Sequence, residues 1–157
     1  MKTKDTPKHE FREIVYDSCK VVGLDDLPSR LISVLQSEKK EISLGELVEI
    51  TGYSLSNLSS TIKWMEDKQM VKKFKKPRSR KIYVEMGQDI TSFFIELQKK
   101  LYHQSLKPPL KKIPEIIQKY ENNEKFNDEL KIIIDYYKQT IFMDEETTKF
   151  IKALEKR

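Results

Sequence analysis

Residues 43–62 read SLGELVEITGYSLSNLSSTI, and they decide the fold. Ser43 followed by Glu46 is a capping box, in which the serine oxygen accepts an N–H of the first helical turn. Gly52 can adopt the left-handed conformation that ends a helix at little cost. Ser54 is a typical N-cap for the helix that follows. Two capped helices joined by so tight a turn predict a helix-turn-helix.

The apolar side chains of this stretch have helical spacing. The first helix is expected to bury Leu44, Leu47 and Val48. In the second helix, from residue 54 to residue 68, apolar residues recur three, four and three positions apart, which places them on one face. They are Leu55, Leu58, Ile62 and Met65.

A cationic segment follows the second helix. Residues 72–81 carry seven Lys or Arg side chains and no acid, so the rest of the chain contributes −2 to the net charge of +5. Residues 71–74 and 81–84 have the composition of two short strands that flank this segment, and its tip is expected near Ser79. A helix-turn-helix followed by a two-stranded hairpin is a winged helix. The expected fold is therefore mainly α, a winged helix-turn-helix with a small β-hairpin wing.

The remaining residues also have helical patterns. Residues 10–22 are expected to form a helix with one buried face, on which Phe11, Ile14, Val15 and Val22 lie beside Cys19. Pro28 suits the first turn of a second helix, whose inner face is Leu31, Ile32 and Leu35.

Beyond Gly87 three further helices are expected, with a break at Lys107-Pro108-Pro109. The last of them either continues through Asp144 or restarts there. We expect residues 10–87 to be the winged helix-turn-helix domain and residues 88–157 to be a C-terminal helical dimerisation region.

Composition excludes several classes of protein. The single cysteine, Cys19, excludes an intrachain disulfide and is typical of a reducing compartment. No apolar run approaches the ~20 residues that cross a bilayer, and residues 1–5 lead into no apolar export segment. His9 and His103 show no metal-ligand spacing with the cysteine. We expect a cytoplasmic protein without membrane, metal or cofactor, and not an enzyme.

The second helix of the helix-turn-helix has an outer face of hydroxyl and amide groups, with no carboxylate before Glu66. Such a face suits the major groove, because it offers donors and acceptors to base edges without repelling phosphate. Asn57 is the best candidate for a base contact, since its amide can pair bidentately with adenine. The alternative is an ordinary solvated helix face. The DNA-contacting residues expected on this helix are Ser54, Ser56, Asn57, Ser59, Ser60 and Lys63.

The concentrated charge of the hairpin indicates a nucleic-acid backbone as its partner. Arg78 and Arg80 suit a narrow minor groove, and the lysines suit phosphates. The alternative is that the lysines only keep an edge strand from pairing, a role for which seven cations are more than needed. The residues expected to contact DNA from the hairpin are Lys72, Lys73, Lys75, Lys76, Arg78, Ser79, Arg80 and Lys81.

The apolar stripes of the C-terminal helices are expected to form a homodimer contact, because a dimer that binds two half-sites gains specificity. The aromatic residues there are expected to fill a core. Aromatic residues can also form a cage around a quaternary ammonium ligand, so the sequence leaves open whether the protein binds a small-molecule effector.

Residues 10 to about 104 resemble the GbsR branch of the MarR-like winged-helix transcriptional regulators. The matching segments are Gly23-Leu24, Leu27-Pro28, Leu31 to Leu35, Ile42 to Leu47, Gly52 to Ser59, Met70-Val71 and Arg78 to Tyr83. The resemblance implies a homodimer held by N- and C-terminal helices, which is usually a repressor on a palindromic site. Some members respond to choline or other small ligands, but the C-terminal helices here show no matching ligand spacing. Gln69 stands where the family usually has glycine.

Together these features predict a homodimeric, sequence-specific regulator that binds double-stranded DNA. Residues 54–68 would lie in the major groove, and residues 72–81 would lie on the backbone or in the minor groove. A winged-helix protein-interaction module and an RNA-binding protein are the alternatives. The cationic hairpin and the carboxylate-poor helix face both favour nucleic acid over a protein partner.

Overall fold

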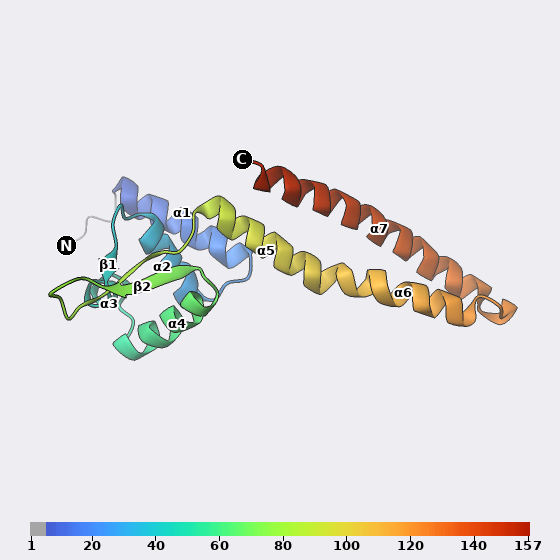
Figure 1. Cartoon of the computed structure of the whole chain (residues 1–157), viewed down its shortest axis with the longest axis horizontal. Helices are drawn as coiled ribbons and strands as arrows, with labels where there is room; N and C mark the ends of the chain where they lie inside the picture. Colours follow the sequence, from blue (N-terminus) through green and yellow to red (C-terminus); the bar gives the residue numbers. More distant parts are fainter. Residues whose placement is uncertain (1–5) are drawn as a thin grey trace. The chain divides into compact units, whose positions relative to one another are not determined.

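The computed structural model describes residues 6–157 and is mainly helical, with one small antiparallel sheet (Figure 1). Two compact units divide the chain, the first ending at Asp89 and the second comprising Ile90–Arg157. The helices of the first unit are α1 (Pro7–Val21), α2 (Asp26–Gln36), α3 (Leu44–Thr51) and α4 (Leu55–Asp67). Those of the second are α5 (Ile90–Ser105), α6 (Lys107–Tyr120), the short 3-10 helix η1 (Glu124–Phe126) and α7 (Asn127–Glu155).

The predicted caps of the helix-turn-helix are confirmed. Ser43 Oγ accepts a hydrogen bond from the N–H of Glu46 at 3.2 Å, and Ser54 Oγ accepts one from the N–H of Asn57 at 3.2 Å. Gly52 has φ +72°, and its N–H donates to the carbonyl of Val48 at 2.9 Å. The left-handed glycine thus ends α3, and only three residues separate it from α4.

The sheet has three strands, one more than the predicted hairpin. Its strands are β1 (Ile42–Ser43), β2 (Val71–Lys75) and β3 (Ile82–Met86), in the order β1-β3-β2. Ile42 lies opposite Val84, and Val71 lies opposite Met86. Because β1 leads directly into α3, this pairing ties the hairpin to the start of the helix-turn-helix.

The tip of the hairpin lies slightly earlier than predicted. The N–H of Ser79 donates to the carbonyl of Lys76 at 3.2 Å, so Pro77 and Arg78 are the central residues of the turn. Arg78 has φ +62°. Proline followed by a residue with positive φ is the pattern of a type II turn.

The core of the first unit consists largely of the predicted residues. Leu47, Leu58 and Met65 are fully enclosed. The other enclosed apolar side chains are Leu31, Ile32, Val34, Ile62, Val71 and Val84. Leu55 is the exception in α4: its predicted burial is wrong, because the side chain is 55% exposed. It belongs to the first turn, which extends past the end of the core.

The predicted buried face of α1 is also wrong. Phe11 is exposed, and Ile14 is 65% exposed. The opposite, polar side of α1 faces α2, where Glu13 pairs with Arg30 and the hydroxyl of Tyr16 donates to Asp26 at 2.8 Å. Cys19 is the buried residue of this helix.

The second unit is a hairpin of helices, in which α7 runs back along α6 and α5 (Figure 1). The predicted break between α5 and α6 is a single residue, Leu106. Pro108 and Pro109 lie in the first turn of α6, where a missing N–H costs little. The last helix continues without interruption through Asp144. None of the helices within residues 6–157 has the length and apolar character needed to cross a membrane.

Gln69, which follows the end of α4, has a strained left-handed backbone conformation with φ +58°. Its N–H donates to the carbonyl of Glu66 at 2.9 Å, and the N–H of Met70 donates to the carbonyl of Met65 at 2.9 Å. These two bonds form a Schellman motif, whose left-handed residue is usually glycine. Residues other than glycine are disfavoured there because Cβ crowds the backbone.

Replacing Gln69→Gly should therefore stabilise the first unit by about 1 kcal/mol. Trp64, the single tryptophan, lies in α4, so its fluorescence during thermal unfolding reports on this unit. Lys68→Gly is the matched control, because Lys68 has φ −92° and gains nothing from glycine. An unfolding midpoint for Gln69→Gly at or below that of the wild type would contradict the strain.

Candidate nucleic-acid interface

The six residues predicted to contact DNA from α4 are all exposed, and we call them the serine surface. They are Ser54, Ser56, Asn57, Ser59, Ser60 and Lys63. On the opposite side of the helix, Leu58, Ile62 and Met65 are fully enclosed, so α4 is anchored with the serine surface outward. Two of the polar groups are already engaged locally, since Ser54 caps the helix and Ser60 Oγ donates to the carbonyl of Asn57 at 3.1 Å.

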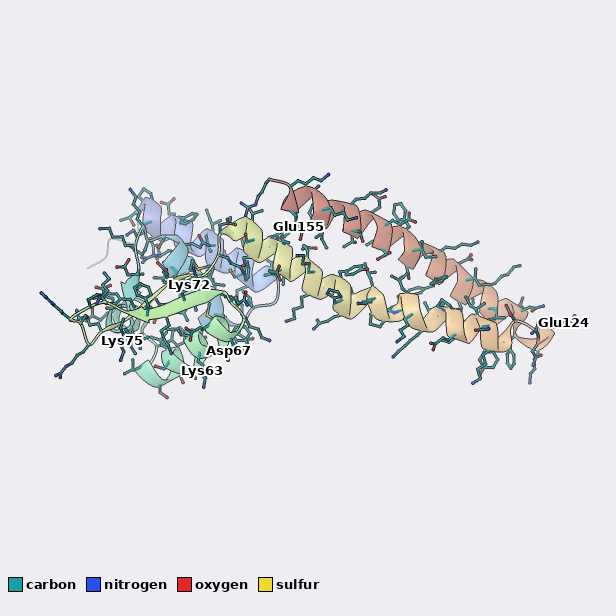
Figure 2. All side chains as sticks on the ribbon, in the orientation of Figure 1. Lys63, Asp67, Lys72, Lys75, Glu124 and Glu155 are labelled. Atoms are coloured by element: carbon teal, nitrogen blue, oxygen red, sulfur yellow. The ribbon has the colours of Figure 1, made fainter. Side chains whose placement is uncertain are left out.

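Charge changes along α4. Figure 2 labels Lys63 and Asp67, and both are exposed. Between Ser54 and Lys63 the helix carries no carboxylate, whereas Glu66 and Asp67 lie in its last turn. A phosphate backbone would be repelled by the last turn and accepted by the first three. The beginning of α4 is therefore the end suited to enter a groove.

The hairpin lies beside α4. Lys73 Nζ is 3.8 Å from Glu66 Oε2, which joins β2 to the last turn of the helix. In Figure 1 the turn of the hairpin and the beginning of α4 both point toward the left edge of the first unit. The cationic hairpin and the serine surface thus belong to one compact unit, and in this view the turn of the hairpin and the beginning of α4 lie on the same side of it.

Lys73 and Lys76, two of the predicted phosphate ligands, already have acidic partners within the chain. Lys76 forms an ion pair with Glu41, just before β1, and its Nζ lies 4.4 Å from the ring centre of Tyr83. This hydrogen bond lowers the pKa of the Glu41 carboxyl and raises that of Lys76. Tyr83 in turn stacks on Phe74, with ring centres 6.0 Å apart. Lys76 and its partners therefore brace the base of the turn.

Ser79 also has a structural role. It is half-buried, and its Oγ accepts a hydrogen bond from the N–H of Lys81 at 3.1 Å. By contrast, no acid within residues 6–157 forms an ion pair with five exposed hairpin cations. These are Lys72, Lys75, Arg78, Arg80 and Lys81. They are the charges that remain available to a ligand.

Sequence reasoning missed the partners of the hairpin. Glu41 is 35 positions from Lys76, and only the pairing of β1 with β3 brings the two together. Glu66 is the first carboxylate of its helix, but no sequence signal links it to Lys73.

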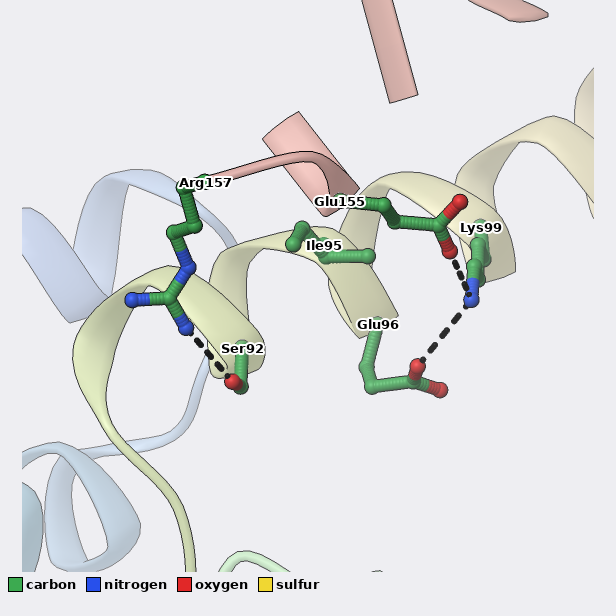
Figure 3. A pocket seen from close by; sticks show the side chains of 6 residues that line it. All are labelled: Ser92, Ile95, Glu96, Lys99, Glu155 and Arg157. Atoms are coloured by element: carbon green, nitrogen blue, oxygen red, sulfur yellow. Dashed lines mark hydrogen bonds and ion pairs between the residues drawn. The ribbon is translucent and has the colours of Figure 1, made fainter. Parts of the chain in front are cut away.

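The second unit has a surface hollow of about 580 Å³ between the start of α5 and the end of α7 (Figure 3). Lys99 Nζ lies 2.7 Å from Glu155 and 3.5 Å from Glu96, and Arg157 donates to Ser92 Oγ at 3.0 Å. The charged groups of the hollow thus pair with one another and join the two helices. The part of the chain that the structure describes holds no group of three or more His, Cys, Asp or Glu side chains placed to bind a metal.

Two curated proteins are similar in sequence to this chain, and no known family profile matches it. One is named "Putative HTH-type transcriptional regulator YvaV" of Bacillus subtilis; it is 27% identical over 140 residues, covering 81% of this chain and 79% of the relative. The other is HTH-type transcriptional regulator FL11 of Pyrococcus furiosus, 28% identical over 109 residues, covering 69% and 70%.

A solved structure has the same fold. It is the crystal structure of a transcriptional regulator, which matches with a TM-score of 0.61 at 12% identity. The match covers 97% of this chain and 100% of the other. The predicted mainly helical fold with a winged helix-turn-helix is therefore confirmed.

Proposed function

We propose that the chain is a homodimeric, sequence-specific regulator of transcription that binds double-stranded DNA, a repressor of the GbsR-like branch of the MarR-type regulators. In this proposal α4 enters the major groove, and the hairpin rests on the backbone or in the minor groove. The proposal depends mainly on one observation. An anchored helix with no carboxylate between Ser54 and Lys63 lies beside a hairpin that carries five cations without an acidic partner in the described chain.

The relatives support this assignment. Both similar proteins are named as HTH-type transcriptional regulators, and their alignments with this chain span 140 and 109 residues. Gln69 departs from the glycine that is usual in the GbsR-like branch, although its left-handed conformation is one that glycine adopts at little cost. Asn57 would pair with adenine in the groove, and the hairpin cations would position the protein on phosphates.

Exposed apolar stripes support the homodimer. On α7, Ile132, Tyr136 and Met143 lie within about 40° of one another around the helix, and Ile132 is 73% exposed. On α1, the apolar side that carries Phe11 and Ile14 is exposed because the polar side is used for α2. Such stripes are costly in water, and a second copy of the chain would cover them.

Selection of bound duplexes from a random pool tests the proposal. We expect an enriched motif with two-fold symmetry, and a complex whose mass corresponds to two chains on one duplex. A structured RNA of equal length should compete poorly, because an A-form major groove does not admit a helix. Failure to enrich any duplex, or stronger binding to RNA, would reject the proposal.

The two neighbouring lysines at the end of the hairpin should differ in their effects. Lys75 has no acidic partner within residues 6–157, whereas Lys76 is held by Glu41. Lys75→Gln should reduce the slope of log affinity against log salt by about 0.9 per protomer, the value for one lost phosphate contact. Lys76→Gln should leave this slope unchanged and weaken binding only modestly. Equal reductions in slope for both variants would show that Lys76 leaves Glu41 and contacts phosphate.

A further inference from the structure

Leu55 is an exposed apolar side chain in an otherwise polar part of α4. It is the first residue of the helix and 55% exposed, whereas Leu58, one turn later, is fully enclosed. Its neighbours Ser54 and Ser56 are both exposed hydroxyl residues. No residue of the unit covers it enough to make it part of the core.

The position of Leu55 suits a contact with base edges. Cα–Cβ bonds tilt toward the N-terminus of a helix, so the side chain of a first residue projects past the helix end. Recognition helices of this class contact bases mainly through their N-terminal residues. The carboxylates in the last turn of α4 also favour contact through the first turn, because they would repel phosphate if the C-terminal end of the helix entered the groove.

The major groove offers one methyl group to such a side chain, the C5 methyl of thymine. The other groups by which base pairs are told apart there are hydrogen-bond donors and acceptors, which a leucine cannot satisfy. On the proposed DNA-binding function, we infer that Leu55 determines specificity by packing against a thymine methyl group in each half-site. The serine hydroxyls and the Asn57 amide read the polar groups beside that thymine.

Replacement of thymine by deoxyuridine removes only this methyl group and tests the inference directly. In the duplex enriched by selection, one thymine position at a time is replaced, together with its symmetry-related position in the other half-site. Affinities for each duplex are measured with the wild type and with Leu55→Ala. At one position the wild type should lose about fourfold in affinity per methyl removed. Leu55→Ala should bind the thymine duplex more weakly and lose little further on the deoxyuridine duplex.

Ile50→Ala is the matched control, because Ile50 is also an exposed apolar residue but lies near the end of α3. This variant should retain the full sensitivity to the thymine methyl. Trp64 fluorescence and the mass of the free protein show whether Leu55→Ala remains folded and keeps its oligomeric state.

The outcomes separate the inference from the function on which it rests. If no duplex is enriched, the proposed function fails and the role of Leu55 fails with it. If a motif is enriched but no thymine shows the effect, or Leu55→Ala retains the same sensitivity, only the role of Leu55 is overturned. A change of oligomeric state in Leu55→Ala would assign the residue to a contact between copies and would also overturn it.

Discussion

Raising the salt concentration from about 50 mM to about 200 mM should weaken binding of the proposed dimer to its duplex by about 10³-fold or more. Each hairpin carries five exposed cations that pair with no acid in residues 6–157, and Lys63 lies on the serine surface. If at least six phosphates are neutralised by two protomers, binding releases a corresponding number of counterions. The free energy gained from this release falls as the salt concentration rises. Titrations at five or more salt concentrations measure the slope. A flat response would contradict a backbone contact by the hairpin.

The tip of the hairpin should account for much of that slope. Arg78→Ala together with Arg80→Ala should weaken binding to all duplexes alike, so the ratio of specific to random affinity is kept. The charge-matched control is Lys111→Ala with Lys112→Ala, which removes two exposed cations from α6. This control should change the slope little. A loss confined to the specific duplex in the arginine variant would instead assign base reading to the tip.

The parts of the fold that sequence predicts well are those decided by neighbouring residues. Ser43 and Ser54 cap their helices because a hydroxyl two or three positions before a free N–H reaches it whatever the rest of the fold does. Gly52 adopts positive φ for an equally local reason. Burial of Leu58 and Ile62 follows from helical spacing in the middle of a helix, where the whole inner face meets the core.

The parts that sequence does not predict depend on what lies across space. Spacing places Leu55 near the core side of α4 but does not show that the core begins only one turn later, at Leu58. It also finds an apolar stripe on α1 without showing that α2 takes the polar side, through Glu13 and Tyr16. In the candidate interface, the sequence gives the number of cations in the hairpin but not which of them have acidic partners. The pairing of Lys76 with Glu41 depends on the third strand, β1, which is only two residues long and therefore has no recognisable strand pattern in the sequence.

Gly87 is expected to be the most sensitive position of the hairpin base, although it has no side chain. It follows β3, and its N–H donates to the carbonyl of Met70 at 2.9 Å. A Cβ at this position would lie 2.7 Å from the carbonyl oxygen of Gln69 and 3.1 Å from the nitrogen of Val71. Both atoms belong to backbone, so neither can rotate away. Relief of the clash must move the turn after α4 or the end of β3.

Gly87→Ala should therefore destabilise the first unit by about 2 kcal/mol, which lowers its unfolding midpoint by roughly 10 °C for a unit of this size. Trp64 fluorescence again reports the transition. Gly45→Ala is the control, because Gly45 lies in α3 with no atom within 4 Å of an added Cβ, and alanine there should be neutral or stabilising. Equal midpoints for the two variants would contradict the close approach.

Loss of DNA binding in Gly87→Ala below its unfolding midpoint would carry a further meaning. The contacts of Gly87 with Gln69, Met70 and Val71 join the end of β3 to the turn between α4 and β2. They therefore fix the angle at which the hairpin leaves α4, and both must meet one duplex at once in the proposed mode of binding. A folded variant with a shifted hairpin would keep each surface but not their common geometry, so its affinity should fall even though none of its cations is removed.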